Sequence, residues 1–245
     1  MIQIPVALQL YSLREMFPVN PLETLKTVKE MGFTGVEFYG CHFQNDFYSS
    51  LLKETGLVCA GWHTPIDDLE GDRFAATVER NLAVGNKYVI VPYFKAESAD
   101  GWKKFADRLN EAAAKLRPYG LYTGFHCHAH EFAPVDGIRP WEIVADNTEK
   151  EVILQLDTGN AMEGGADIYA TLEAFPERNQ SIHFKPYKAP GDFKVALGED
   201  DHDLERLLAW CQEVGDTDWI IVEYEKEDPL NFCRKSLEAI RALQK

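Results

Sequence analysis

The chain has 245 residues, of which 45% are hydrophobic, which is ordinary for a globular protein with a sizeable core. Its formal net charge is −15, from 25 basic and 40 acidic residues, and this argues against binding to nucleic acid, whose affinity comes largely from Lys and Arg neutralising phosphates. No apolar run approaches the ~20 residues of a membrane helix, and no signal peptide is recognisable at the N-terminus, so we expect a cytoplasmic protein whose partners include neither nucleic acid nor a membrane.

In chain order, short apolar runs typical of β-strands alternate with longer segments that have the apolar spacing of helices. The strand-like runs cover residues 7–11, 35–39, 57–63, 88–93, 121–127, 152–156, 181–185 and 219–224. The helix-like segments cover residues 21–31, 47–55, 72–84, 102–119, 140–146, 167–175, 204–214 and 229–243. Gly32 and Gly120 stand where a helix should stop, and Pro229 lies in the first turn of the last one. The strands recur roughly every 30 residues, which is the length of one βαβ unit.

Eight such units in a chain of this length predict an α/β fold, a (β/α)8 TIM barrel that forms a single domain over residues 1–245. The competing architecture is an open, doubly wound sheet. That fold normally carries a glycine-rich phosphate loop after its first strand, whereas Ser12-Leu13-Arg14-Glu15 follows the first strand here, and neither GxGxxG nor GxxxxGK[ST] occurs in the chain. The barrel is therefore favoured.

The most unusual stretch, Phe125-His126-Cys127-His128-Ala129-His130-Glu131-Phe132, follows an apolar run, and three later apolar runs end at Asp157, His183 and Glu223. Because the carboxyl ends of barrel strands meet at one rim, we expect Glu131, Asp157, His183 and Glu223 to converge and hold one divalent metal ion. Three oxygen ligands and one nitrogen ligand suit Mn²⁺, Co²⁺ or Mg²⁺, with Zn²⁺ a less typical alternative. The simpler interpretation is that these residues form ordinary salt bridges at the rim.

Side-chain alternation along a strand limits how many residues of this stretch can share one site. His126, His128 and His130 have the same parity and Glu131 has the other, so they cannot all point to one place unless the strand ends or bulges between them. We expect His126 or His128 to reach a substrate and His130 to pack against its neighbours. Two further candidates for substrate binding stand on earlier strands: Glu37 and His63.

Several motifs along the whole chain carry a family resemblance. They are Gln9-Leu10-Tyr11-Ser12-Leu13-Arg14, Gly32-Phe33-Thr34-Gly35-Val36-Glu37-Phe38, the histidine-rich stretch 125–132, Leu156-Asp157-Thr158-Gly159-Asn160, His183-Phe184-Lys185 and Val222-Glu223-Tyr224. Through these motifs the sequence resembles the xylose isomerase-like TIM barrels, the superfamily of sugar phosphate isomerases and epimerases. The combination of His-x-His-x-x-Glu-Phe with His-x-Lys is the more specific part.

The resemblance implies that a Glu, an Asp, a His and a Glu hold the metal, and these match Glu131, Asp157, His183 and Glu223. It also implies that Glu131 and Glu223 move the proton. One would remove it from the carbon next to a carbonyl, giving a cis-enediolate held by the metal, and the other would return it. The expected protein is a metal-dependent isomerase or epimerase whose substrate is a small carbohydrate, either a sugar or a sugar phosphate.

The chain departs from the family pattern at two residues that we expect to contact substrate. Asn160 stands where ketose epimerases carry a His, and Lys185 is followed by Pro186 where many relatives have Asp. A dehydratase or lyase that acts on a keto-sugar or an inosose with the same metal site therefore stays open. An endonuclease of abasic DNA needs more zinc ligands than the chain offers, and a non-catalytic sugar-binding barrel should lack one of the four ligands. Oligomers are common in the family, so the resemblance implies a homo-oligomer.

Overall fold

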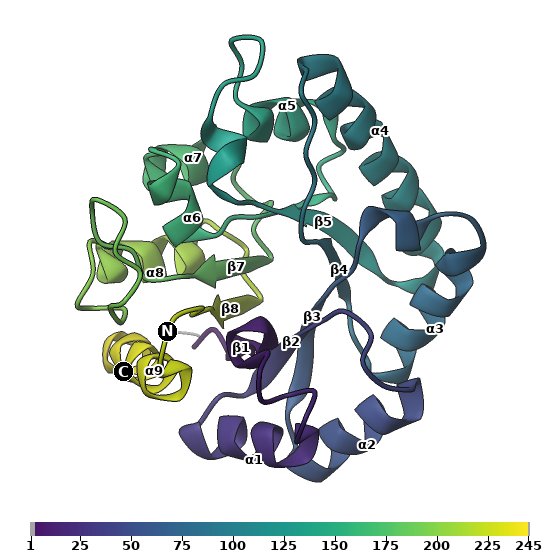
Figure 1. Cartoon of the computed structure of the whole chain (residues 1–245). Helices are drawn as coiled ribbons and strands as arrows, with labels where there is room; N and C mark the ends of the chain where they lie inside the picture. The colour runs from purple at the N-terminus through teal and green to yellow at the C-terminus, as the bar shows by residue number, and fades with distance from the viewer. Residues whose placement is uncertain (1–2, 245) are drawn as a thin grey trace.

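Eight parallel strands form one sheet in the computed structural model, which describes residues 3–244. The strands are β1 (Val6–Gln9), β2 (Gly35–Tyr39), β3 (Val58–His63), β4 (Tyr88–Val91), β5 (Tyr122–His126), β6 (Ile153–Gln155), β7 (Ser181–Phe184) and β8 (Trp219–Val222). The sheet curls around a common centre with helices on its outside (Figure 1). The expected (β/α)8 barrel is confirmed.

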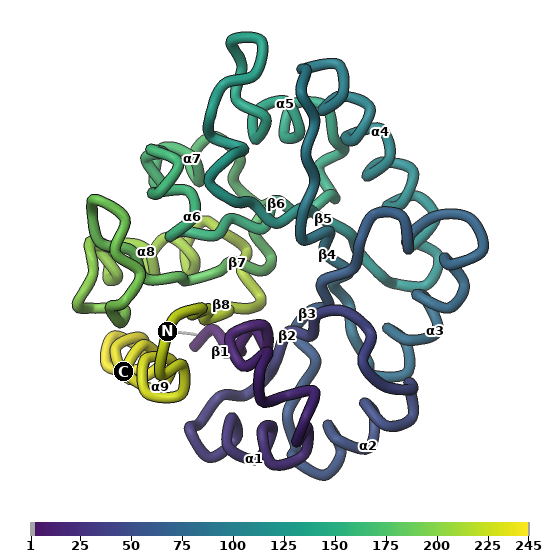
Figure 2. The backbone as a smooth tube through the Cα atoms, in the orientation of Figure 1, coloured from purple at the N-terminus to yellow at the C-terminus, as the bar shows by residue number. Residues whose placement is uncertain are grey.

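The barrel is nearly closed, and its seam lies between β6 and β7. Strands pair in chain order and β1 also pairs with β8, so the beginning and the end of the chain lie side by side (Figure 2). Between β6 and β7 the structure has an isolated parallel bridge of Asp157 with His183, and the backbone N–H of His183 donates to the carbonyl oxygen of Leu156 at 2.9 Å. Two residues that the sequence singles out therefore form the seam.

Helices cover the outer face of the sheet, as Figure 1 shows. The α-helices are α1 (Pro21–Met31), α2 (Asn45–Thr55), α3 (Phe74–Ala83), α4 (Ala99–Leu116), α5 (Pro140–Asn147), α6 (Thr158–Glu163), α7 (Ile168–Ala174), α8 (Leu204–Glu213) and α9 (Pro229–Leu243). Short 3₁₀ helices are η1 (Leu10–Leu13), η2 (Ile66–Leu69), η3 (Gly71–Arg73), η4 (Arg117–Tyr119) and η5 (Ala129–Phe132). No helix within residues 3–244 is both long and apolar enough to cross a membrane.

Helix ends follow local capping chemistry. α1 has the expected bounds because Pro21 fits its first turn and Gly32 adopts the left-handed φ of 105° that ends it. α4 begins earlier than expected, since Ser98 Oγ accepts a hydrogen bond from the backbone of Gly101 at 3.1 Å. The sequence pattern does not predict α6, which begins directly after Asp157. The side chain of Asp157 caps it by accepting from the backbone N–H at position 160 at 2.8 Å.

The inside of the barrel changes from apolar to polar along the strands. Alternate residues of a strand share one face, so Ala7 and Gln9 on β1 point the same way, as do Ile153 and Gln155 on β6. Ala7 and Ile153, near the beginnings of their strands, are buried in small apolar clusters. Gln9 and Gln155, at the strand ends, are also buried. The inside of the barrel therefore has an apolar layer at the beginnings of the strands and a polar layer at their ends. The outer faces of the strands pack against the helices in the main core.

Candidate active site

A cavity of about 370 Å³ opens at the carboxyl ends of the strands, where the catalytic residues of TIM barrels lie. Each strand, or the segment after it, contributes to the lining, which consists of Gln9, Tyr11, Tyr39, Gly40, His63, Pro65, Pro92, Tyr93, His126, His128, Asn160, Lys185, Glu223 and Glu225. Tyr11 and Tyr93 are well exposed, whereas His126 and Glu223 are buried. The cavity thus has an aromatic entrance and a polar floor.

Four buried side chains converge at this floor. His126, Asp157, His183 and Glu223 each offer one donor atom, and these atoms all lie within 4.8 Å of one another. Asp157 Oδ2 lies 3.9 Å from both His126 Nε2 and His183 Nδ1, and it has no hydrogen-bond partner among the described residues. A buried carboxylate oxygen without a partner is costly, so this donor set fits a divalent cation.

Hydrogen bonds beneath the floor orient both imidazoles toward the cluster. His126 Nδ1 donates to Gln155 Oε1 at 3.0 Å, which leaves His126 Nε2 free to bind a metal. His183 Nε2 donates to Glu37 Oε2 at 2.7 Å, which directs His183 Nδ1 to the cluster. A metal-binding histidine usually donates its other N–H in this way. Both histidines are therefore arranged as ligands.

Burial and the neighbouring charges shift the pKa values of the residues in this cluster. Burial raises the pKa of Asp157 to about 7. Burial alone would lower the pKa of His183, but the neighbouring carboxylates of Glu37 and Glu223 outweigh it and raise this pKa to about 10. Burial alone would raise the pKa of Glu223, but Lys185 and His183 hold it well below its usual range. In the metal-free protein a proton on His183 Nδ1 therefore bridges to Glu223 Oε2 at 2.7 Å, a position that a metal ion can take over.

The structure does not bring Glu131, expected as a ligand and as a proton carrier, to this cluster. β5 ends at His126, and the chain then turns into η5, where Glu131 Oε2 accepts from the backbone N–H of His128 at 2.8 Å. Glu131 Oε1 lies 3.1 Å from His130 Nε2, and that nitrogen also donates to the carbonyl oxygen of Phe94 at 2.9 Å. The geometry thus assembles Asp157, His183 and Glu223 as expected and adds His126 in the place given to Glu131.

The residues expected to contact substrate fall into two groups. Those that line the cavity are His63, His126, His128, Asn160 and Lys185. Glu37 is fully buried and does not belong to the lining, so its carboxylate lies beneath the site. Two residues that the sequence does not single out, Gln9 and Gln155, are also buried there. A glutamine at an inward-facing position of an otherwise apolar strand is the feature of the sequence that could have indicated their role.

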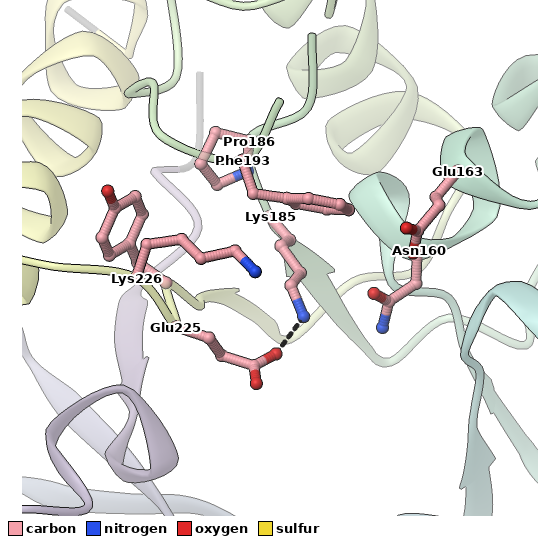
Figure 3. Close-up of a pocket in the computed structure, with 8 residues that line it drawn as sticks. Asn160, Glu163, Lys185, Pro186, Phe193, Glu225 and Lys226 are labelled. Atoms are coloured by element: carbon pink, nitrogen blue, oxygen red, sulfur yellow. Dashed lines mark hydrogen bonds and ion pairs between the residues drawn. The ribbon is translucent and has the colours of Figure 1, made fainter. Parts of the chain in front are cut away.

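A smaller pocket of about 150 Å³ adjoins the cavity and shares Asn160, Lys185 and Glu225 with it. In Figure 3, Lys185 reaches Glu225, with Phe193 and Lys226 on the sides of the pocket. Lys185 Nζ also donates to Glu223 Oε1 at 3.2 Å. Lys185 is buried and links the four-residue cluster to the side pocket.

Residues 25–243 match the model of the family described as the xylose isomerase-like TIM barrel. The chain belongs to this family. A curated relative, the inosose dehydratase of Geobacillus kaustophilus (strain HTA426), is 25% identical over 164 residues, which are 58% of this chain and 53% of that protein. The chain therefore spans about half the length of this relative.

Several solved structures have a similar fold over nearly the whole chain, among them the following two. A sugar phosphate isomerase/epimerase from Parabacteroides distasonis ATCC 8503 gives a TM-score of 0.83 at 19% identity and covers 100% of this chain and 96% of its own. A xylose isomerase-like TIM barrel protein from Mycobacterium smegmatis, in complex with magnesium, gives a TM-score of 0.73 at 13% identity and covers 99% of this chain and 97% of its own. At these identities the likeness establishes the fold alone.

Proposed function

We propose that this protein is a metal-dependent isomerase or epimerase that moves a proton next to the carbonyl of a small sugar. The observation that carries the proposal is the buried set of His126, Asp157, His183 and Glu223 at the floor of the cavity. The sugar phosphate isomerase/epimerase of similar fold and the magnesium complex are consistent with it. Two imidazole nitrogens and two carboxylate oxygens suit Mn²⁺, Co²⁺ or Zn²⁺ better than Mg²⁺.

When bound, the metal would act as a Lewis acid that polarises the substrate carbonyl and makes the neighbouring C–H bond more acidic. Glu223 belongs both to the cluster and to the cavity wall, so its carboxylate is the candidate base. Lys185, 3.2 Å from Glu223 Oε1, keeps this carboxylate ionised and ready to accept a proton. His63 and His128 line the cavity as well and are candidates to bind sugar hydroxyls. The exposed rings of Tyr11 and Tyr93 are candidates to pack against the sugar at the entrance.

A dehydratase is the second candidate, and the position of Glu131 favours it. Epimerisation by two glutamates needs a carboxylate on each side of the substrate, but Glu131 is not part of the cavity lining. Elimination of water from a keto-sugar needs only one base next to the carbonyl, and Glu223 lies both in the cluster and in the cavity wall. The related inosose dehydratase points the same way.

Proton exchange separates these candidates and tests the proposal. The protein, loaded with Mn²⁺ or Co²⁺, is incubated in D₂O with a panel of ketoses, ketose phosphates and keto-inositols, and products are followed by NMR and mass spectrometry. Deuterium at the carbon next to the carbonyl, without loss of mass, supports an isomerase or epimerase, and loss of one water supports the dehydratase. Glu223→Gln should abolish either reaction, and Glu142→Gln on the surface of α5 is the matched control. A metal-loaded protein that exchanges no proton with any of the panel contradicts the proposal.

A further inference from the structure

Four hydrogen-bond donors converge on the carboxylate of Glu37 beneath the cavity floor. Oε2 accepts from Gln9 Nε2 at 2.6 Å and from His183 Nε2 at 2.7 Å, and lies 3.0 Å from His63 Nε2. Oε1 accepts from Gln155 Nε2 at 3.0 Å. Glu37 is fully buried, so these side chains take the place of water around its charge.

Hydrogen bonds to groups other than Glu37 fix the orientation of the side-chain amides of Gln9 and Gln155. Gln9 Oε1 accepts from the backbone N–H of Tyr11 at 3.0 Å, so Gln9 must present its amide N–H group to Glu37. Gln155 Oε1 accepts from His126 Nδ1 at 3.0 Å, so Gln155 likewise presents its N–H group. Every partner of Glu37 is thus a donor, and a carboxylate, which only accepts, satisfies all of them.

The neighbouring strand, β3, leaves space for this carboxylate. Gly61 on β3 pairs with Glu37 at a shift in the register between β2 and β3. A Cβ atom at position 61 would lie 2.4 Å from Glu37 Oε1, closer than any real contact of that kind. A glycine at this position therefore allows Glu37 to turn inward under the metal-binding cluster.

We propose that Glu37 is a positioning residue that fixes both histidine ligands of the metal and does not contact substrate. It holds His183 directly, so that Nδ1 points to the cluster, and it holds His126 through Gln155, so that Nε2 does. The cluster draws its two nitrogen donors from β5 and β7, and Glu37 on β2 reaches both from inside the barrel. This inference rests on the metal site of the proposed function, and it names Glu37 as the residue that holds the two histidine ligands of that site in place.

Metal binding by the full-length protein tests this role. The affinity for Co²⁺ and for Zn²⁺ is measured by competition with a chelator, and the visible absorption of bound Co²⁺ reports the ligand geometry. In Glu37→Gln one N–H group must face another donor, so His183 or Gln155 rotates. We expect a loss of affinity of roughly 10- to 100-fold and an altered Co²⁺ spectrum. Gly61→Ala should have the same effects, because it displaces the carboxylate without removing its charge.

Thr123→Val is the matched control. Thr123 is as buried as Glu37, but its hydroxyl donates to the carbonyl oxygen of Val89 away from the cluster, so its loss lowers stability without changing metal affinity or the Co²⁺ spectrum. Thermal unfolding of each variant shows which ones are folded, and Gly61→Ala carries the test if Glu37→Gln does not fold. Wild-type affinity in a folded Glu37→Gln or Gly61→Ala protein would overturn the positioning role. A wild-type protein that binds neither ion would instead refute the metal site itself.

Discussion

Asp157 and His183 face each other across the seam of the barrel, in the bridge between β6 and β7. Their side chains meet again in the cluster, where Asp157 Oδ2 lies 3.9 Å from His183 Nδ1. The same two residues thus connect β6 with β7 through their backbone and contribute two of the four donor atoms of the cluster through their side chains. A metal ion bound by both side chains would link the ends of β6 and β7 and stabilise the barrel at this seam.

Metal should therefore stabilise the fold. At a concentration of Mn²⁺ or Co²⁺ 100-fold above its dissociation constant, we expect a gain of about 2.7 kcal/mol, or roughly 5–10 °C in the unfolding temperature, which a chelator reverses. Asp157→Asn should abolish this shift. Without metal this variant should be at least as stable as the wild type, because it removes a buried carboxylate oxygen that has no partner within the described chain. An equal metal-induced shift in Asp157→Asn would contradict the role of Asp157 as a ligand.

Two variants test whether His126 or Glu131 is the fourth ligand of the metal. His126→Gln should weaken the binding of Co²⁺ or Zn²⁺ by at least about 100-fold, since the imidazole nitrogen that faces Asp157 is lost. Glu131→Gln should bind close to one ion per chain, because Glu131 bonds within its own turn instead. Metal content after dialysis and chelator competition measure both. If Glu131→Gln loses the metal and His126→Gln keeps it, the ligand set expected from the family resemblance is the correct one.

Lys185 should be important for stability as well as for the site. It is buried between Glu223 and Glu225, and both carboxylates pair with its Nζ. Lys185→Met removes the cation between these two acids and leaves Glu225 with none beside it and Glu223 with His183 alone, so the metal-free protein should lose about 3 kcal/mol of stability. Urea unfolding monitored by tryptophan fluorescence measures this loss. Lys226→Met, at an exposed lysine in the adjoining pocket, is the matched control and should change stability by less than about 0.5 kcal/mol.

The metal-free protein should lose stability between about pH 4.5 and pH 8 because of Glu131. Burial raises the pKa of Glu131 from an ordinary value of 4.5 to about 8. The folded state therefore keeps a proton that the unfolded state releases, so the contribution of this group is complete below about pH 4.5 and is lost as the pH rises through about 8. The unfolding temperature of Glu131→Gln should fall less than that of the wild type between pH 6 and pH 9. Parallel pH profiles of the two proteins would show that Glu131 is ionised in the fold at neutral pH.

Much of the architecture follows from local signals in the sequence. Pro21 and Gly32 mark both ends of α1, and the repeating alternation of strand and helix is sufficient to predict the barrel. Because the barrel gathers the ends of its strands at one rim, the polar residue that follows each apolar run can be assigned to that rim. This reasoning places Asp157, His183 and Glu223 at the rim, and in the fold their side chains lie together.

Only the tertiary structure shows that His126, and not Glu131, lies beside Asp157, His183 and Glu223. Spacing along the chain places both residues at the same strand end, and the family resemblance favours Glu131. In the fold β5 ends at His126, and η5 turns the carboxylate of Glu131 back onto its own backbone. The role of Glu37 likewise depends on partners from β1, β6 and β7 that are far apart in the sequence. The sequence determined which residues reach the rim, because strand alternation is local, whereas only the packed barrel decided which of them meet, because the direction of a side chain there depends on strands that are distant in the chain.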